Sequence, residues 1–147
     1  MPQSFMDEAL AEARAAQAAD EVPVGAVIVR DGAVIARTGN RTLRDRDPTA
    51  HCEMLAIRQA AAALRTERLI DCDLYVTLEP CTMCAAAISF ARLRRLYYGA
   101  ADVKGGAVEN GVRYFAAPTC HHRPEVYGGM GESEAGALLK EFFRARR

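Results

Sequence analysis

The sequence predicts an α/β fold with three layers, in which helices pack on both faces of a mixed sheet of about five strands. Four segments are helix-like, and short apolar runs alternate with them. Two of these runs flank an Asp-Gly pair, which is typical of a hairpin turn. A hairpin followed by alternating helices and strands produces a sheet of this mixed kind.

Four segments are expected to be helices. The first begins at Ser4, a candidate N-cap with Asp7 three residues on. The third begins at Cys81, directly after Pro80, because proline suits the first turn of a helix. The last helix has the clearest amphipathic pattern, with its apolar side chains on one face. The predicted helices cover residues 4–19, 50–64, 81–92 and 132–146.

Strands are expected between these helices. An Asp-Gly turn at residues 31–32 joins the first two, because a type I′ turn needs positive φ at both central positions. The third strand is a fully apolar run of the buried type. The predicted strands cover residues 24–29, 34–35, 74–78 and 95–98, with a short fifth strand inside the Gly-rich segment 102–127.

Length and charge limit the classes of function. The chain has 147 residues, which suits one domain over residues 1–147 with a single core. Lys plus Arg number 19 and Asp plus Glu number 19, so the whole molecule has no basic footprint for nucleic acid, although a local basic patch is compatible with this balance. No apolar run approaches the roughly 18 residues of a membrane span, and the acidic N-terminus is unlike a secretory signal. We therefore expect a cytoplasmic protein with no membrane partner.

The cysteines and histidines predict a metal site. Five cysteines in a cytoplasmic chain are interpreted first as metal ligands, catalytic groups or small buried side chains. Cys81 and Cys84 form a Cys-x-x-Cys pair at a helix start, so both sulfurs should project from one face. His51 opens another helix and supplies a third ligand. Three such ligands plus one water are typical of catalytic zinc, and we predict one zinc ion per chain.

Glu53 is the candidate catalytic residue. Because it follows His51 by two positions, it lies about 200° around an ideal helix and should not ligate the same metal from a regular turn. It can instead reach a water on the metal, take the proton of that water and return it to the substrate.

Other arrangements of these residues remain open. A closed zinc site that only supports the fold would take its fourth ligand from among Cys52, Cys120, His121 and His122. We interpret Cys52 and Cys72 as small buried side chains, and residues 120–122 as a loop. A carboxylate that lies beside the metal without ligating it favours catalysis, because a structural site has no use for it.

Several motifs together resemble one family. His51-Cys-Glu53 followed by Pro80-Cys-Thr-Met-Cys84 matches the known signature of zinc-dependent nucleobase deaminases. Glu-Val-Pro-Val-Gly-Ala at residues 21–26 and Phe-Phe-Arg-Ala-Arg at residues 142–146 point to the tRNA branch. Over nearly its whole length the sequence resembles the bacterial tRNA-specific adenosine deaminases. This resemblance implies a cytidine deaminase-like fold and hydrolytic conversion of adenosine to inosine at the wobble position of the anticodon.

The resemblance also implies roles for individual residues. It assigns the same zinc ligands and makes Glu53 the proton shuttle, while Asn40 would hydrogen-bond the flipped base. It implies a homodimer in which neighbouring subunits shape each site, a tRNA anticodon stem-loop as substrate, and no DNA partner. Cys52 departs from the alanine that is usual at its position, and its larger thiol is expected to be tolerated. The residues that fall where the family contacts RNA are Asp102, Lys104, Phe143 and Arg146.

Two alternatives to tRNA deamination stay open. A deaminase of free guanine, cytosine or a nucleoside would keep the zinc site and lack the RNA surface. A zinc-stabilised binding module would lack catalysis altogether. Near the C-terminus, Phe142 is expected in the core, and Phe143 in the core or at the RNA. The terminal arginines also complement the helix dipole, which explains them without RNA.

Overall fold

The structure, a computed structural model, describes residues 2–146. Five strands in this part of the chain form one sheet in the order β2-β1-β3-β4-β5. β1 pairs antiparallel with both β2 and β3, whereas β3, β4 and β5 run parallel. The predicted fold class is therefore confirmed. The strands are β1 (Gly25–Arg30), β2 (Ala33–Gly39), β3 (Cys72–Leu78), β4 (Arg95–Ala100) and β5 (Glu125–Tyr127).

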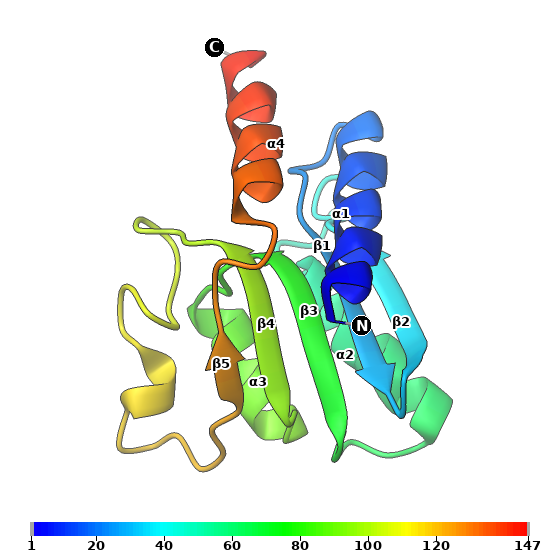
Figure 1. The fold of residues 1–147 in the computed structure, drawn as a ribbon, viewed down its shortest axis with the longest axis vertical. Coiled ribbons are helices and arrows are strands. Elements are labelled where there is room, and N and C mark those ends of the chain that lie inside the picture. Colours follow the sequence, from blue (N-terminus) through cyan, green and yellow to red (C-terminus); the bar gives the residue numbers. More distant parts are fainter. Residues whose placement is uncertain (1, 147) are drawn as a thin grey trace.

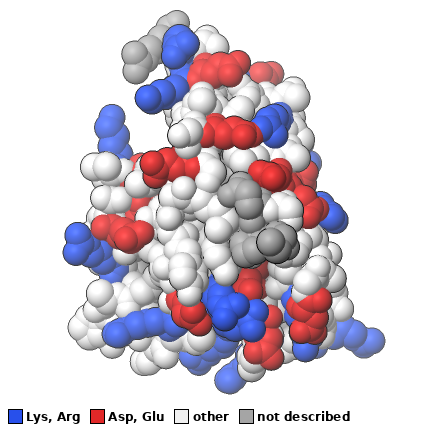
Figure 2. All heavy atoms as spheres, in the orientation of Figure 1, with Lys and Arg blue, Asp and Glu red and all other residues white. Residues whose placement is uncertain are grey.

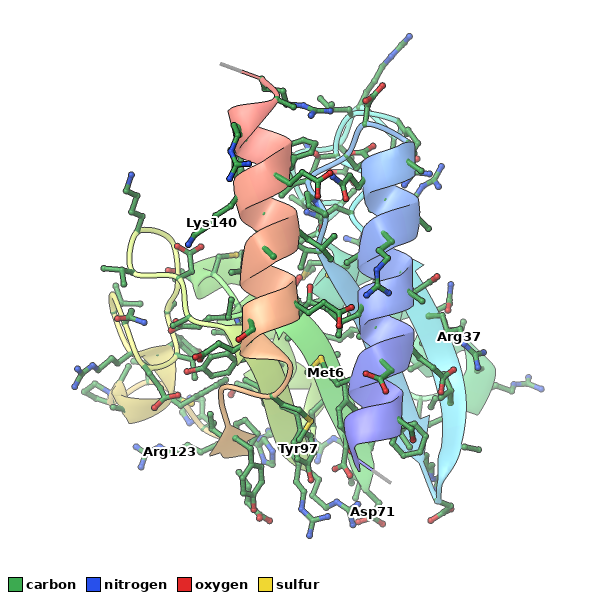
Figure 3. All side chains as sticks on the ribbon, turned by 45° about the horizontal axis from the view of Figure 1, so that its top comes forward. Met6, Arg37, Asp71, Tyr97, Arg123 and Lys140 are labelled. Atoms are coloured by element: carbon green, nitrogen blue, oxygen red, sulfur yellow. The ribbon has the colours of Figure 1, made fainter. Side chains whose placement is uncertain are left out.

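Helices cover both faces of the sheet (Figure 1). α1 (Pro2–Ala18) and α4 (Glu132–Arg144) lie on one face, and α2 (Cys52–Leu64) and α3 (Thr82–Ala91) lie on the other. Alternate side chains of β1 enter the two cores, because successive residues of a strand point to opposite faces. Ile28 packs in the core on the α2 and α3 side, and Val27 packs with Met6 on the α1 side. Figure 3 shows Met6 directed from α1 toward the sheet.

Local chemistry accounts for the hairpin and for the helix starts. Asp31 and Gly32 have φ values of 52° and 77°, as a type I′ turn requires. The predicted cap at Ser4 is wrong, because α1 already begins at Pro2 and Ser4 lies inside its first turn. α2 and α3 begin later than predicted, at Cys52 and Thr82, since the residue before each is extended and serves as the N-cap.

Three tyrosines stack across the parallel strands on the face that carries α1. Tyr75, Tyr97 and Tyr127 occupy paired positions of β3, β4 and β5. Their ring centroids are 4.4 Å and 5.0 Å apart, with interplanar angles of 3° and 20°. Phe5 of α1 ends the row, 5.5 Å from the ring of Tyr75. Aromatic pairs of this kind contribute about 0.5–1.5 kcal/mol each beyond the area that they bury.

The surface carries both signs of charge. Figure 2 shows Lys and Arg interspersed with Asp and Glu over one face, without a broad area of a single sign. None of the helices within residues 2–146 combines the length and apolar character that crossing a bilayer would need.

Candidate active site

The three predicted metal ligands meet at the N-terminal ends of α2 and α3. His51 and Cys81 are the N-cap residues of these helices, and Cys84 lies in the first turn of α3. His51 Nδ1 is 3.5 Å from Cys81 Sγ and 3.6 Å from Cys84 Sγ. All three ligand atoms lie within 4.8 Å of one another. Helix N-termini favour the negative charge that thiolate ligands carry.

These spacings fit a tetrahedral zinc ion. Zn–S bonds of about 2.3 Å and a Zn–N bond of about 2.0 Å, at a tetrahedral angle, place nitrogen and sulfur about 3.5 Å apart. Among residues 2–146, no other His, Cys, Asp or Glu belongs to this group. The group therefore has three protein ligands, the number that catalytic zinc sites use. In the part of the chain that the structure describes, a closed site with four protein ligands does not form.

Residues 120–122 take part in the fold rather than in the metal group. The thiol of Cys120 donates to the carbonyl of His122 at 3.1 Å. The Nε2 atom of His122 lies 2.6 Å from the carbonyl of Leu93, and its backbone N–H donates to Ser89 Oγ at 3.3 Å. These bonds attach the loop before β5 to the end of α3.

Hydrogen bonds among the ligands shift their pKa values. The thiol of Cys84 donates to Cys81, and together with His51 this lowers the pKa of Cys81 to about 4. The same hydrogen bond, with burial, raises the pKa of Cys84. The Cys81 sulfur in turn raises the pKa of His51. Coordination of a metal by both sulfurs must therefore displace the proton of Cys84.

Glu53 lies beside this group without belonging to it. It is in the first turn of α2, with only 5% of its surface exposed, and it lines the cavity described below. Burial raises the pKa of Glu53, against its own backbone N–H and the Cys52 thiol, which favour the charged form. That thiol donates to Glu53 Oε1 at 3.2 Å. Cys52 itself is fully buried in the core, as predicted.

A cavity of about 500 Å³ opens in front of the metal group. Cys84 is fully buried behind it. Arg146 turns away from the cavity, because its guanidinium lies 3.5 Å from the centre of the Phe142 ring and pairs with Asp20 at 3.0 Å. Phe142 is buried and Phe143 is half exposed. The predicted site residues that line the cavity are Asn40, His51, Glu53, Cys81, Asp102, Lys104 and Phe143.

The side chain of Asn40 is oriented by the start of α2. Its Oδ1 accepts the backbone N–H of Cys52 at 2.8 Å. Within the described residues its Nδ2 makes no hydrogen bond, so the N–H₂ is the part of the amide that can bind a ligand in the cavity.

Two buried carboxylates near the cavity were not predicted to have a role. Burial alone would raise the pKa of Glu21, but the backbone N–H groups of Arg44 and Leu43 outweigh it, and the pKa is lowered. Burial likewise opposes the lowered pKa of Glu79, which the N–H groups of Asp102 and Asn110 bring about. In the sequence, each of these glutamates is a single acidic residue next to a buried apolar run. That pattern does not indicate which hydrogen-bond donors the carboxylate will meet in the fold.

The sequence is similar to those of known proteins. Residues 1–100 match the family model of the cytidine and deoxycytidylate deaminase zinc-binding region. The chain is 66% identical over 143 residues to the tRNA-specific adenosine deaminase of Agrobacterium fabrum, covering 97% of this chain and 94% of that protein. It is 43% identical over 143 residues to the tRNA-specific adenosine deaminase of Bacillus subtilis, covering 97% of this chain and 89% of that protein.

The fold is also similar to those of solved structures. One from a study of A-to-I editing by tRNA:A34 deaminases has a TM-score of 0.91 at 66% identity, covering 92% of this chain and 99% of that chain. A guanine deaminase from Nitrosomonas europaea has a TM-score of 0.79 at 29% identity, covering 97% of this chain and 84% of that chain.

Proposed function

This chain belongs to the cytidine and deoxycytidylate deaminase family, and we propose that residues 1–147 form one zinc-dependent domain that deaminates adenosine to inosine at the wobble position of a tRNA anticodon. The observation that carries this proposal is the identity to a tRNA-specific adenosine deaminase over nearly the whole chain. The three-ligand metal group supports the same chemistry. Adenosine and water give inosine and ammonia.

Glu53 is the proposed proton carrier. Zinc, when bound by His51, Cys81 and Cys84, makes a water molecule nucleophilic near neutral pH. The Glu53 carboxylate takes a proton from this water and delivers it to N1 of adenine while the water oxygen bonds to C6. The same carboxyl then moves the remaining hydroxyl proton to the exocyclic nitrogen, so the C6–N6 bond breaks and ammonia leaves. A buried carboxyl with a raised pKa suits both directions of proton transfer.

The remaining cavity residues are proposed to hold the nucleotide. A base must leave its stack to enter the cavity, which favours a nucleotide in an anticodon loop. The Asn40 N–H₂ donates to an acceptor nitrogen of the purine, and the half-exposed Phe143 can stack on a base. Asp102 and Lys104 both line the cavity and lie two residues apart in the same segment. We propose that Lys104 meets a phosphate at the cavity, and that Arg146, which lies outside the cavity and pairs with Asp20, meets a phosphate farther along the RNA.

Replacing Asn40 by aspartate should weaken substrate recognition without loss of zinc. The Oδ1 atom that accepts the Cys52 N–H is kept, but the N–H₂ donor is lost. We expect kcat/KM on an anticodon stem-loop to fall about 10- to 100-fold, the worth of one strong hydrogen bond. Steady-state kinetics and elemental analysis would measure both effects. An unchanged kcat/KM would exclude Asn40 from base binding.

The substrate class is tested by ammonia release from matched substrates. Purified enzyme would be given an anticodon stem-loop with adenosine at the wobble position, the same stem-loop with guanosine there, and free adenosine, guanine, cytosine and cytidine. We expect turnover of the adenosine stem-loop and little release from the free compounds, because the residues proposed to bind the flanking RNA would add nothing to the binding of a free base or nucleoside. Turnover of free guanine or cytosine with none on RNA would favour the free-base alternative.

We further propose that the enzyme works in the cytoplasm, where its tRNA substrate is found, and as a homodimer whose neighbouring subunits shape each site. Two large apolar side chains are exposed and could be covered in such a dimer: Leu43, which follows the cavity residue Thr42, is 69% exposed, and Phe90 of α3 is 70% exposed. Neither a DNA nor a membrane partner is proposed.

A further inference from the structure

One buried carboxylate connects the metal motif with a wall of the cavity. Glu79 lies between the end of β3 and Cys81, and only 2% of its surface is exposed. Its two oxygens accept five N–H donors, all from the segment 102–110. Oε1 accepts the backbone N–H of Asp102 at 2.9 Å and the side-chain N–H of Asn110 at 2.7 Å. Oε2 accepts the backbone N–H groups of Val108, Glu109 and Asn110 at 3.1, 2.8 and 3.0 Å.

The segment is wrapped tightly around this carboxylate. Gly106 lies so close that a Cβ atom there would stand 2.5 Å from Glu79 Cδ and 2.5 Å from the carbonyl of Asp102. The backbone N–H of Ala107 donates to the carbonyl of Pro80 at 2.9 Å. The path of the segment is therefore set by residues that immediately precede the ligand Cys81.

The outer side of the same segment forms the wall of the cavity. Asp102, Lys104 and Gly105 line the cavity, and neighbouring Val103 is 80% exposed. Residues 101–107 belong to no helix or strand. The Asp102 side chain accepts the N–H groups of Lys104 and Gly105 and so shapes the turn itself. Figure 3 shows Lys140 of α4 extending on the side of this segment.

We infer that Glu79 is a positioning residue for substrate recognition: it holds the wall formed by residues 102–105 at a fixed place relative to the metal ligands. The inference rests on the proposed function, because that wall is where the RNA is proposed to bind. Glu79 needs no contact with the substrate to act in this way. A carboxylate suits the role because it is an acceptor at both oxygens, and all five of its partners are donors.

Glu79→Gln tests this inference with little change in volume. The amide places an N–H₂ donor among donors, so at least one hydrogen bond is lost. We expect amide hydrogen exchange to speed up about 10- to 100-fold at residues 102–110, the factor that one charge-assisted hydrogen bond is worth. KM for the anticodon stem-loop should rise by a similar factor, kcat should change less, and the zinc content should stay near one ion per chain.

Glu21→Gln is the matched control. Glu21 is also a buried carboxylate, and it accepts the backbone N–H groups of Leu43 and Arg44 at 3.2 and 2.8 Å. This variant should speed exchange at residues 43–44 and leave residues 102–110 unchanged. A general loss of stability would instead speed exchange in both segments of either variant.

Asn110→Ala removes the hydrogen bond from the Asn110 side chain to Glu79 and leaves Glu79 itself unchanged. This variant tests the inference if Glu79→Gln does not fold. If Glu79→Gln and Asn110→Ala, or whichever of the two folds, leave exchange at residues 102–110 unchanged, the inference is overturned. Faster exchange there with an unchanged KM would overturn it as well. The exchange measurement needs no RNA, so it tests the link between Glu79 and residues 102–110 even if the wild-type enzyme is inactive on the stem-loop. Inactivity of the wild-type enzyme on the stem-loop would count against the proposed function alone.

Discussion

Glu53→Ala should abolish turnover while the protein still binds its zinc. The carboxyl is the group proposed to carry protons from water to N1 and then to the leaving nitrogen, and it is not among the three ligands. Loss of a general acid–base group typically costs about 10²- to 10⁴-fold in rate. Single-turnover ammonia release from an anticodon stem-loop would measure the rate, and elemental analysis would measure the metal.

Glu53→Gln is the control for packing, because Glu53 is buried and alanine leaves a cavity. The glutamine fills the same space but cannot carry the proton, so both variants should be equally inactive and the glutamine variant should match the wild type in stability. Wild-type rates in either variant would remove the proposed proton shuttle. Activity lost together with the zinc would show instead that Glu53 supports the metal.

Removal of zinc by a chelator should abolish deamination and leave the fold in place. The ligands join the starts of α2 and α3, but a hydrophobic core lies on each side of the sheet, and none of the three ligands belongs to either core. A chain of this length can bury a sufficient core without a metal. We expect far-UV circular dichroism to change little, activity to fall to background, and added zinc to restore it.

Cys84→Ala should make the loss permanent, because this sulfur is a proposed ligand and lies at the buried side of the group. Added zinc should then restore little activity. Full activity of metal-free wild-type protein would contradict the proposed mechanism. Cooperative unfolding of the whole chain on chelation would show that the metal holds the fold as well.

Features set by near neighbours in the sequence could be predicted. The Asp31-Gly32 turn depends on two residues that tolerate positive φ, and α4 shows its buried face through its spacing alone. The set of candidate zinc ligands could also be predicted, because the type, order and spacing of the ligands restrict a zinc site strongly. The resemblance to the deaminase family is confirmed by the comparisons.

Features that depend on distant parts of the chain could not be predicted. The donors that meet Glu79 lie 23 to 31 residues away, and nothing local shows where a loop will direct its N–H groups. The ion pair of Arg146 with Asp20 spans 126 residues and turns that guanidinium away from the cavity. The expected cap at Ser4 was wrong for a local reason, because proline suits the first turn of a helix and α1 already begins at Pro2.

The row of tyrosines across β3, β4 and β5 gives the protein an optical signal of its own. The chain contains no tryptophan and only five tyrosines, so its near-ultraviolet spectrum is dominated by phenol rings, three of which belong to this stack. Closely stacked chromophores held in a chiral frame couple their transitions, and the coupling disappears once the strands separate. Near-ultraviolet dichroism should therefore report separation of the parallel strands without any attached label.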